Sequence, residues 1–207
     1  MTADVTSTSK PRRTQDERSS TTRRALLEAT IDCLVEEGYA NLTTTKVAAR
    51  AQVSRGAQVH HFPTKATLVS EAIQYLIAQV SQSLFSELGQ LPPGSQRADA
   101  AMDLLWNTYR GRLFQAVVQL SVAGAGDAEI EEKLGVLNRV VTDVIRGAVP
   151  VLFPQEANHP HFEDALYTTI NAMTGLAVVQ RVAKLSEAEV AGRWRRTKAQ
   201  LLRLISD

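Results

Sequence analysis

Two short segments near the amino terminus constrain the fold more than any other feature of this 207-residue sequence. Three consecutive threonines, at positions 43–45, precede a segment that ends near Ala51, and Ser54 precedes another that ends near His60. Hydroxyl side chains at such positions accept hydrogen bonds from the first backbone amides of a helix, so both segments are predicted to be helical. Helices shorter than about 12 residues are marginal alone in water. These two must therefore pack against a longer neighbour.

That neighbour is predicted over residues 20–37, where Leu27, Ile31 and Leu34 recur at helical spacing and Gly38 supplies a left-handed carboxyl cap. A long helix that braces two short helices joined by a tight turn forms a helix-turn-helix unit. We place this unit at residues 19–66. The preceding residues 1–18 are basic and lack periodicity, so a flexible arm is expected there.

The remaining residues, 67–207, are predicted to form a larger helical body. Aromatic residues make up only 5% of the chain, and the abundant residues are Ala, Leu, Val, Glu, Arg and Gln, which favour helix over sheet. The expected fold class is therefore all-α, with an amino-terminal three-helix head on this body. Apolar spacing, prolines and glycines place the later helices at about 64–88, 96–110, 113–122, 127–152, 161–184 and 187–206.

Charge is divided unevenly along the chain, although the net charge is only +1. Residues 1–70 hold ten Lys or Arg against seven Asp or Glu, whereas the remainder holds thirteen against fifteen. Residues 41–70 contain four Lys or Arg and two His, with no Asp or Glu. Because nucleic-acid binding depends on local charge, we expect this surface to receive an anion unopposed.

A short helix held by a turn can enter the major groove of DNA with its first residues facing base edges. In the second short helix, Arg55 can donate two hydrogen bonds to guanine, Gln58 can pair with adenine, and Gly56 allows close approach. Side chains predicted at helix ends can bind phosphates and fix the register on the duplex. These are Thr44, His60 and Lys65.

The head resembles the amino-terminal domain of the tetracycline-repressor-like (TetR) family over about residues 20–70. The resemblance rests on GY at 38–39, LTTTKVAARAQVSRGA at 42–57 and HHFPTKATLV at 60–69. It implies an all-helical homodimer that regulates transcription, usually as a repressor, by binding a palindromic operator in double-stranded DNA. It also implies that the body binds a small-molecule effector, which releases the DNA. The expected DNA contacts are Thr44, Thr45, Arg55, Gly56, Gln58, Val59, His60, His61 and Lys65.

Two positions depart from the pattern of many members. Gln52 stands where glycine is common, and because such turns use a positive backbone angle, a strained or different turn is expected. Gln58-Val59 stands where Leu-Tyr is common. That tyrosine commonly binds phosphate in the family, so we expect His60 or His61 to replace it.

An effector cavity in the body is expected from the resemblance, since pockets in helical bodies are mostly apolar with a few polar groups. The same side chains would also suit an ordinary core. Four polar residues could orient a polar ligand: Arg110, Gln115, Gln119 and Asn171. The same residue types also occur at ordinary exposed positions of amphipathic helices. The expected lining residues are Met102, Trp106, Tyr109, Phe114, Tyr167 and Met173.

The last two helices are expected to form the homodimer interface. Helix 161–184 carries small residues that permit close packing, and helix 187–206 offers Trp194, Leu201 and Ile205 at helical spacing. Packing within one chain would explain the same pattern. The resemblance favours a two-fold four-helix interface.

Other functional classes have weaker support. His159 and His161 are too sparse and badly spaced for a metal site, so neither a metal nor another cofactor is expected. No catalytic or phosphate-binding motif occurs, and no catalytic residue is assigned. The chain lacks a membrane-length apolar run and an apolar leader, so a cytoplasmic protein is expected. The alternative is a helical small-molecule binder or enzyme with a vestigial helix-turn-helix.

Overall fold

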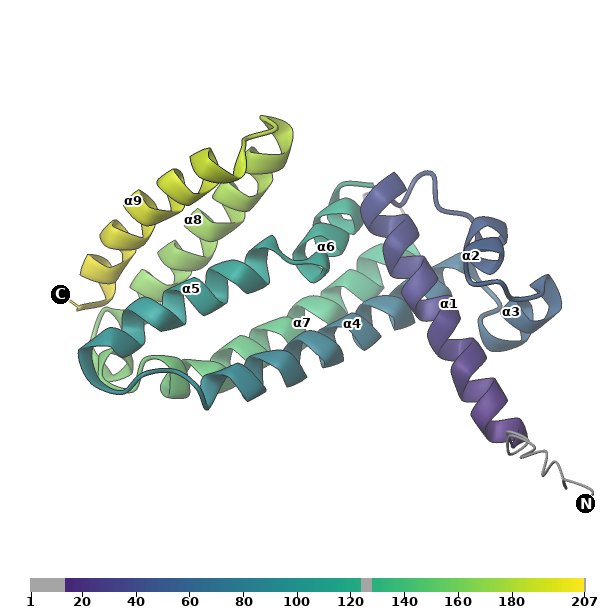
Figure 1. Cartoon of the computed structure of the whole chain (residues 1–207), viewed down its shortest axis with the longest axis horizontal. Helices are drawn as coiled ribbons and strands as arrows, with labels where there is room; N and C mark the ends of the chain where they lie inside the picture. Colours follow the sequence, from purple (N-terminus) through teal and green to yellow (C-terminus); the bar gives the residue numbers. More distant parts are fainter. Residues whose placement is uncertain (1–13, 124–127, 207) are drawn as a thin grey trace, which may run out of the picture.

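The computed structural model describes residues 14–123 and 128–206 (Figure 1). Within these two ranges the regular elements are all helices and no strand occurs, which confirms the predicted fold class. The helices are α1 (Gln15–Glu37), α2 (Thr44–Arg50), α3 (Arg55–His61), α4 (Lys65–Leu88), η1 (Gly94–Gln96), α5 (Arg97–Arg110), α6 (Arg112–Ala123), α7 (Ala128–Leu152), η2 (Glu156–Asn158), α8 (Phe162–Val182) and α9 (Glu187–Ser206).

Helix α1 begins at Gln15, earlier than the predicted residue 20. The Thr14 hydroxyl accepts a hydrogen bond from the backbone amide of Glu17, and the Glu17 carboxylate accepts one from the backbone amide of Thr14. This reciprocal arrangement is a capping box, a sequence signal that the prediction overlooked. The expected flexible arm over 1–18 is therefore wrong for residues 15–18, and residues 1–13 lie outside the described part.

The predicted hydroxyl caps of the short helices are present. Thr43 caps α2 by accepting from the amide of Lys46, and Ser54 caps α3 by accepting from the amide of Ala57, both at 3.2 Å. A third hydroxyl, on Thr64, caps α4 in the same way. These caps fix where each helix starts, and so they set the direction in which α3 leaves the turn.

The turn between α2 and α3 has the backbone strain expected from its sequence. Gln52 has φ +54°, in the left-handed region that favours glycine. Its amide donates to the Ala49 carbonyl, and the Val53 amide donates to the Ala48 carbonyl at 2.9 Å. This pair of bonds is a Schellman motif, which ends α2 by satisfying its last carbonyls.

The hydrophobic core continues from the head into the body, with no break between residues 66 and 67. One cluster joins Leu27 and Ile31 of α1 to Ile73 of α4 and Leu120 of α6. A second cluster lies farther from the head and joins the end of α4 to α5, α7, α8 and α9. Helices α4 and α6 thus pack directly against α1, and a movement of either can reach the head.

The molecule is elongated, with the head at one end and the α8–α9 pair toward the other (Figure 1). Helices α4 and α7 lie side by side, and α8 and α9 pack on each other as an antiparallel pair. Helix α5 lies between these two pairs. Within the described ranges, no helix combines the length and the apolarity that a membrane crossing would require.

Candidate functional site

Helix α3 presents a narrow exposed face. Arg55 and Val59 are one turn apart, as are Gly56 and His60, and all four are exposed. Val59 is 49% exposed, so this face of α3 presents an apolar side chain to solvent. A methyl-bearing side chain next to an arginine matches the chemistry of base edges in the major groove, where thymine presents a methyl group and guanine two acceptors.

Arg55 and Gly56 are open toward solvent. The Arg55 side chain makes no hydrogen bond or ion pair with any residue of the described ranges. A Cβ atom added at Gly56 would meet nothing within 4 Å, so the protein's own packing does not require glycine there. The Arg55 guanidinium is therefore available to donate hydrogen bonds to a partner, and the backbone at Gly56 is open to close approach.

Gln58 lies inside the head, contrary to the expected contact with adenine. Its side chain is 1% exposed, and its Nε2 atom donates to the carbonyl oxygen of Phe62 at 2.7 Å. A side chain enclosed by protein cannot reach a base edge. Gln58 instead links the middle of α3 to its carboxyl-terminal cap, and its position inside the head leaves Arg55 and Val59 outside.

The basic surface of the head is partly neutralised by the end of α1, contrary to the expectation that anions approach it unopposed. Lys46 Nζ lies 2.6 Å from Glu37 Oε2, and Arg50 Nη2 lies 2.6 Å from Glu36 Oε2. Both pairs are largely exposed, so solvent screens them and each contributes little to stability. They nevertheless leave Arg55 as the more available cation of this surface.

The remaining expected DNA contacts differ in exposure. Thr45 is exposed and Thr44 is half-buried, both in the first turn of α2.

Lys65 donates to the Tyr39 carbonyl at 2.7 Å, and its ammonium lies 3.9 Å from the centre of the Tyr39 ring. Lys65 thus holds the α1–α2 loop against α4. His61 is half-buried, and desolvation, assisted by the nearby charges of His60 and Arg23, lowers its pKa below the ordinary value.

An apolar cavity of about 220 Å³ lies in the body among α4, α5, α6, α7 and α8. Tyr109 and Phe114, both expected to line an effector site, do line it, with ring centroids 5.3 Å apart. No charged side chain is among its lining residues. Burial raises the pKa of the Tyr109 hydroxyl, an effect opposed by a hydrogen bond with Thr174, so the phenol stays neutral. The lining residues are Ile77, Val80, Ser81, Leu84, Leu105, Thr108, Tyr109, Leu113, Phe114, Val117, Val144, Ile145 and Thr174.

The other four expected lining residues lie elsewhere. Met102 is fully buried in the core, and Trp106 stacks on Trp194 with ring centroids 4.9 Å apart. Met173 borders only a void of about 20 Å³ beside the cavity. Tyr167 is 70% exposed on the outer side of α8. Helical spacing alone did not show which side of each helix faces the cavity.

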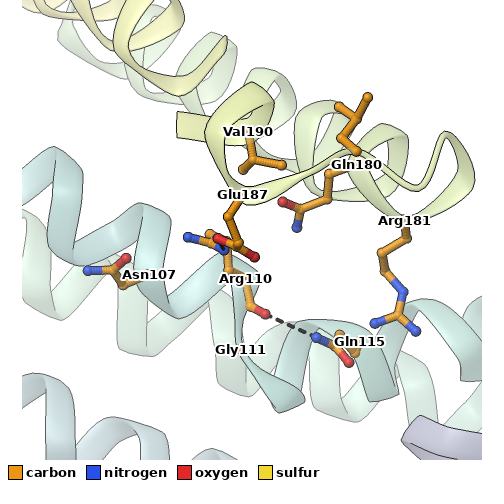
Figure 2. A pocket seen from close by; sticks show the side chains of 9 residues that line it. Asn107, Arg110, Gly111, Gln115, Gln180, Arg181, Glu187 and Val190 are labelled. Atoms are coloured by element: carbon orange, nitrogen blue, oxygen red, sulfur yellow. Dashed lines mark hydrogen bonds and ion pairs between the residues drawn. The ribbon is translucent and has the colours of Figure 1, made fainter. Parts of the chain in front are cut away.

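A second, polar cavity of about 530 Å³ lies between the α5–α6 turn and the α8–α9 connection (Figure 2). Arg110 forms an ion pair with Glu187 there, and Gln115 Nε2 donates to the Arg110 carbonyl at 3.1 Å. Arg181 extends into the cavity from α8 (Figure 2). Of the residues weighed for a polar ligand, Arg110 and Gln115 thus share one site, whereas Asn171 is exposed on α8.

Arg112 connects the body to the head. It follows the α5–α6 turn and forms an ion pair with Asp32 of α1, with Glu28 of α1 at 3.8 Å. The Tyr75 hydroxyl of α4 also donates to Glu28, at 2.8 Å. Sequence analysis missed this cluster, because ion pairs between distant segments leave no local spacing signal.

Comparison with known proteins agrees with this architecture. Residues 26–72 match the family described as "Bacterial regulatory proteins, tetR family". The HTH-type transcriptional regulator CymR of Pseudomonas putida is 33% identical over 81% of this chain and 83% of its own length.

Solved structures show the same fold at lower sequence identity. A transcriptional regulator from Rhodococcus sp. Rha1 superposes with a TM-score of 0.66 at 21% identity, covering 87% of this chain and 96% of that one. A transcriptional regulator from Saccharomonospora viridis, solved in complex with choline, gives 0.67 at 18% identity, covering 90% and 96%. Together with the helix-turn-helix head and its outward-facing Arg55, these similarities establish that the chain is a DNA-binding transcriptional regulator of the TetR family.

Proposed function

We propose that this protein is a ligand-responsive repressor that binds a palindromic operator as a dimer and reads it with the exposed face of α3. The observation that carries the proposal is the open pair Arg55 and Gly56, which projects from a short helix fixed by the buried Gln58. In this proposal Arg55 binds guanine, Val59 contacts a thymine methyl, and His60 and Thr45 bind the adjacent backbone.

Dimerisation is proposed through the outer sides of α8 and α9, because Trp194, Leu201 and Ile205 of α9 are buried in the core of the protomer and cannot contact a partner. Along α8 the exposed residues include Tyr167, Gly175, Val179 and Val182, which follow one side of the helix, and Val182 is 79% exposed. A Cβ atom at Gly175 would meet nothing within 4 Å, so this glycine has no packing role within the protomer. This side of α8, which is apolar apart from Asn171 and contains a glycine, suits close approach of a second copy about a two-fold axis.

The apolar cavity is the proposed effector site. Its lining offers hydroxyl groups of Ser81, Thr108 and Tyr109 but no charge, so it suits a small, mainly apolar molecule with one or two hydrogen-bonding groups. An ionised group buried there would lose its hydration without gaining a counter-charge.

A route from this cavity to the head is also proposed. Tyr109 and Phe114 flank the α5–α6 turn, and Arg112, the first residue of α6, is paired with α1. A ligand that separates the two rings would displace the start of α6, and the ion pairs with Asp32 and Glu28 would transmit the displacement to α1. The orientation of α3 relative to DNA depends on α1, because α1 packs on α2 and α3.

The test is a selection of bound fragments from random duplex DNA by the wild type and by Arg55→Ala. Arg55→Ala should lose preference at one base pair in each half-site, at a cost of roughly 1–3 kcal/mol for that position. Arg146→Ala is the control, because Arg146 is an exposed arginine on α7 in the body. Unchanged base preferences in Arg55→Ala would refute the assigned reading role.

A further inference from the structure

The polar cavity between the α5–α6 turn and the α8–α9 connection plays no part in the proposed effector response. Its charged lining consists of two arginines, Arg110 and Arg181, and one carboxylate, that of Glu187. Arg110 is paired with Glu187, whereas Arg181 forms no hydrogen bond or ion pair within the described ranges. The cavity therefore holds one uncompensated positive charge, surrounded by amide groups that can donate hydrogen bonds.

We propose that this cavity is a second ligand site, which binds the carboxylate or phosphate group of a small anionic molecule through Arg181 and Arg110. A guanidinium binds either group through two parallel hydrogen bonds, which gives it both affinity and orientation. The amides of Asn107, Gln115 and Gln180 line the same cavity and can bind the polar remainder of the ligand. The volume of about 530 Å³ is large enough for an organic acid as well as for a bare ion.

Glu187 occupies part of this site and shows that it accepts a carboxylate. It lies in the first turn of α9 with its side chain 83% exposed, and it pairs with Arg110 across the cavity (Figure 2). Exposed ion pairs of this kind contribute little free energy, so an incoming acid group can replace the Glu187 carboxylate on Arg110. Glu187 is thus a built-in competitor, and its removal should strengthen ligand binding.

The polar cavity is separate from the apolar cavity and from the proposed dimer face of α8. The apolar cavity is lined by Leu105, Thr108 and Tyr109 of α5, whereas the polar cavity is lined by Asn107 and Arg110 of that helix. Successive helical residues point about 100° apart. Gln180 and Arg181 therefore leave α8 in directions different from those of Val179 and Val182, so a partner on the dimer face need not close the polar cavity.

The proposal is tested by calorimetric titration of the full chain at constant ionic strength with benzoate, with inorganic phosphate, and with benzamide as the uncharged analogue of benzoate. Saturable binding of benzoate or of phosphate is expected. If benzoate binds more tightly than phosphate, benzamide should bind at least tenfold more weakly than benzoate. The stronger of the two anions identifies the acid group. Failure of both anions to bind would overturn the proposal, and so would benzamide that binds as tightly as the stronger of the two anions.

Three variants locate the binding in this cavity. Arg181→Gln should weaken the anion at least tenfold, and Glu187→Gln should strengthen it severalfold because the competing carboxylate is gone. Arg146→Gln removes an arginine outside the cavity and should change nothing. Unchanged affinity in Arg181→Gln, or weaker binding in Glu187→Gln, would place the anion elsewhere and contradict the proposal, whatever the outcome of the DNA-binding experiments.

Discussion

At the scale of single residues, the turn between the two short helices stores strain that one substitution can remove. Gln52 adopts φ +54°, which costs a non-glycine residue about 1–2 kcal/mol. Gln52→Gly should therefore raise the free energy of unfolding by up to about 1 kcal/mol, after allowance for the greater entropy of glycine in the unfolded chain. Urea unfolding measures this change, and Gln52→Ala, which keeps the strain, should stay near the wild type. A destabilised Gln52→Gly would contradict this explanation of the turn.

A substitution at Gly56 can distinguish what folding requires at this position from what the proposed DNA binding requires. Because nothing lies within 4 Å of an added Cβ, Gly56→Ala should stabilise α3 by about 0.5–1 kcal/mol. The same methyl group would stand on the surface that we propose faces DNA, so affinity for the selected operator should fall. Urea unfolding gives the free energy of unfolding, and fluorescence anisotropy on the same preparation gives the affinity for operator DNA. If the variant is more stable and binds DNA as tightly as the wild type, Gly56 does not lie in the DNA interface.

Residue identity predicted the caps and the strained turn but not the orientation of every side chain. Thr43 and Ser54 could be identified as caps because capping depends on immediate neighbours. Gln58 could not be placed inside the head, because a helix of seven residues offers too few positions to define its buried side. The stack of Trp106 on Trp194 brings together helices far apart in sequence, and no local pattern encodes it.

At the scale of helices, the tie between α6 and α1 should carry part of the effector response. Arg112→Gln removes the ion pairs with Asp32 and Glu28, which are exposed enough that stability should change by less than about 1 kcal/mol. Coupling between two sites is typically about 1–3 kcal/mol, so losing this tie should reduce severalfold the factor by which an effector weakens DNA binding.

This prediction is checked by measuring effector affinity with and without operator DNA. Effector affinity for the free protein should be unchanged in Arg112→Gln, since Arg112 does not line the apolar cavity. Arg146→Gln controls for the loss of one positive charge. Undiminished coupling in Arg112→Gln would show that the packing of α4 and α6 on α1, and not these ion pairs, transmits the response.

Helix positions were largely predictable, and their mutual packing was not. The predicted break at Gly111 separates α5 from α6, and the predicted ends of α4 and α8 lie within two residues of those observed. These limits depend on glycine, proline and hydroxyl residues that act locally. Which sides of α5 and α8 face the apolar cavity depends on how the helices pack, and so Tyr167 was expected inside although it is exposed.

At the scale of the whole molecule, dimerisation should depend on the glycine in the middle of α8. Gly175→Arg should produce monomers, because the long side chain prevents close approach of a second α8, and operator affinity should fall with it. Gly147→Arg on α7 is a matched control, since its added Cβ would likewise meet nothing within 4 Å. Light scattering at micromolar concentration distinguishes the two states. A Gly175→Arg dimer as stable as the wild type would place the interface on another surface.

The arrangement of bases that the full chain selects from random duplex DNA shows whether a symmetric dimer reads its operator through α3. If two copies of α3 read DNA from one symmetric dimer, the selected fragments must contain an inverted repeat whose half-sites are about 34 Å apart, or a multiple of the helical repeat. Arg55→Ala should lose the same base pair in both half-sites. A single asymmetric site, or half-sites in direct repeat, would contradict a symmetric dimer that reads its operator through α3.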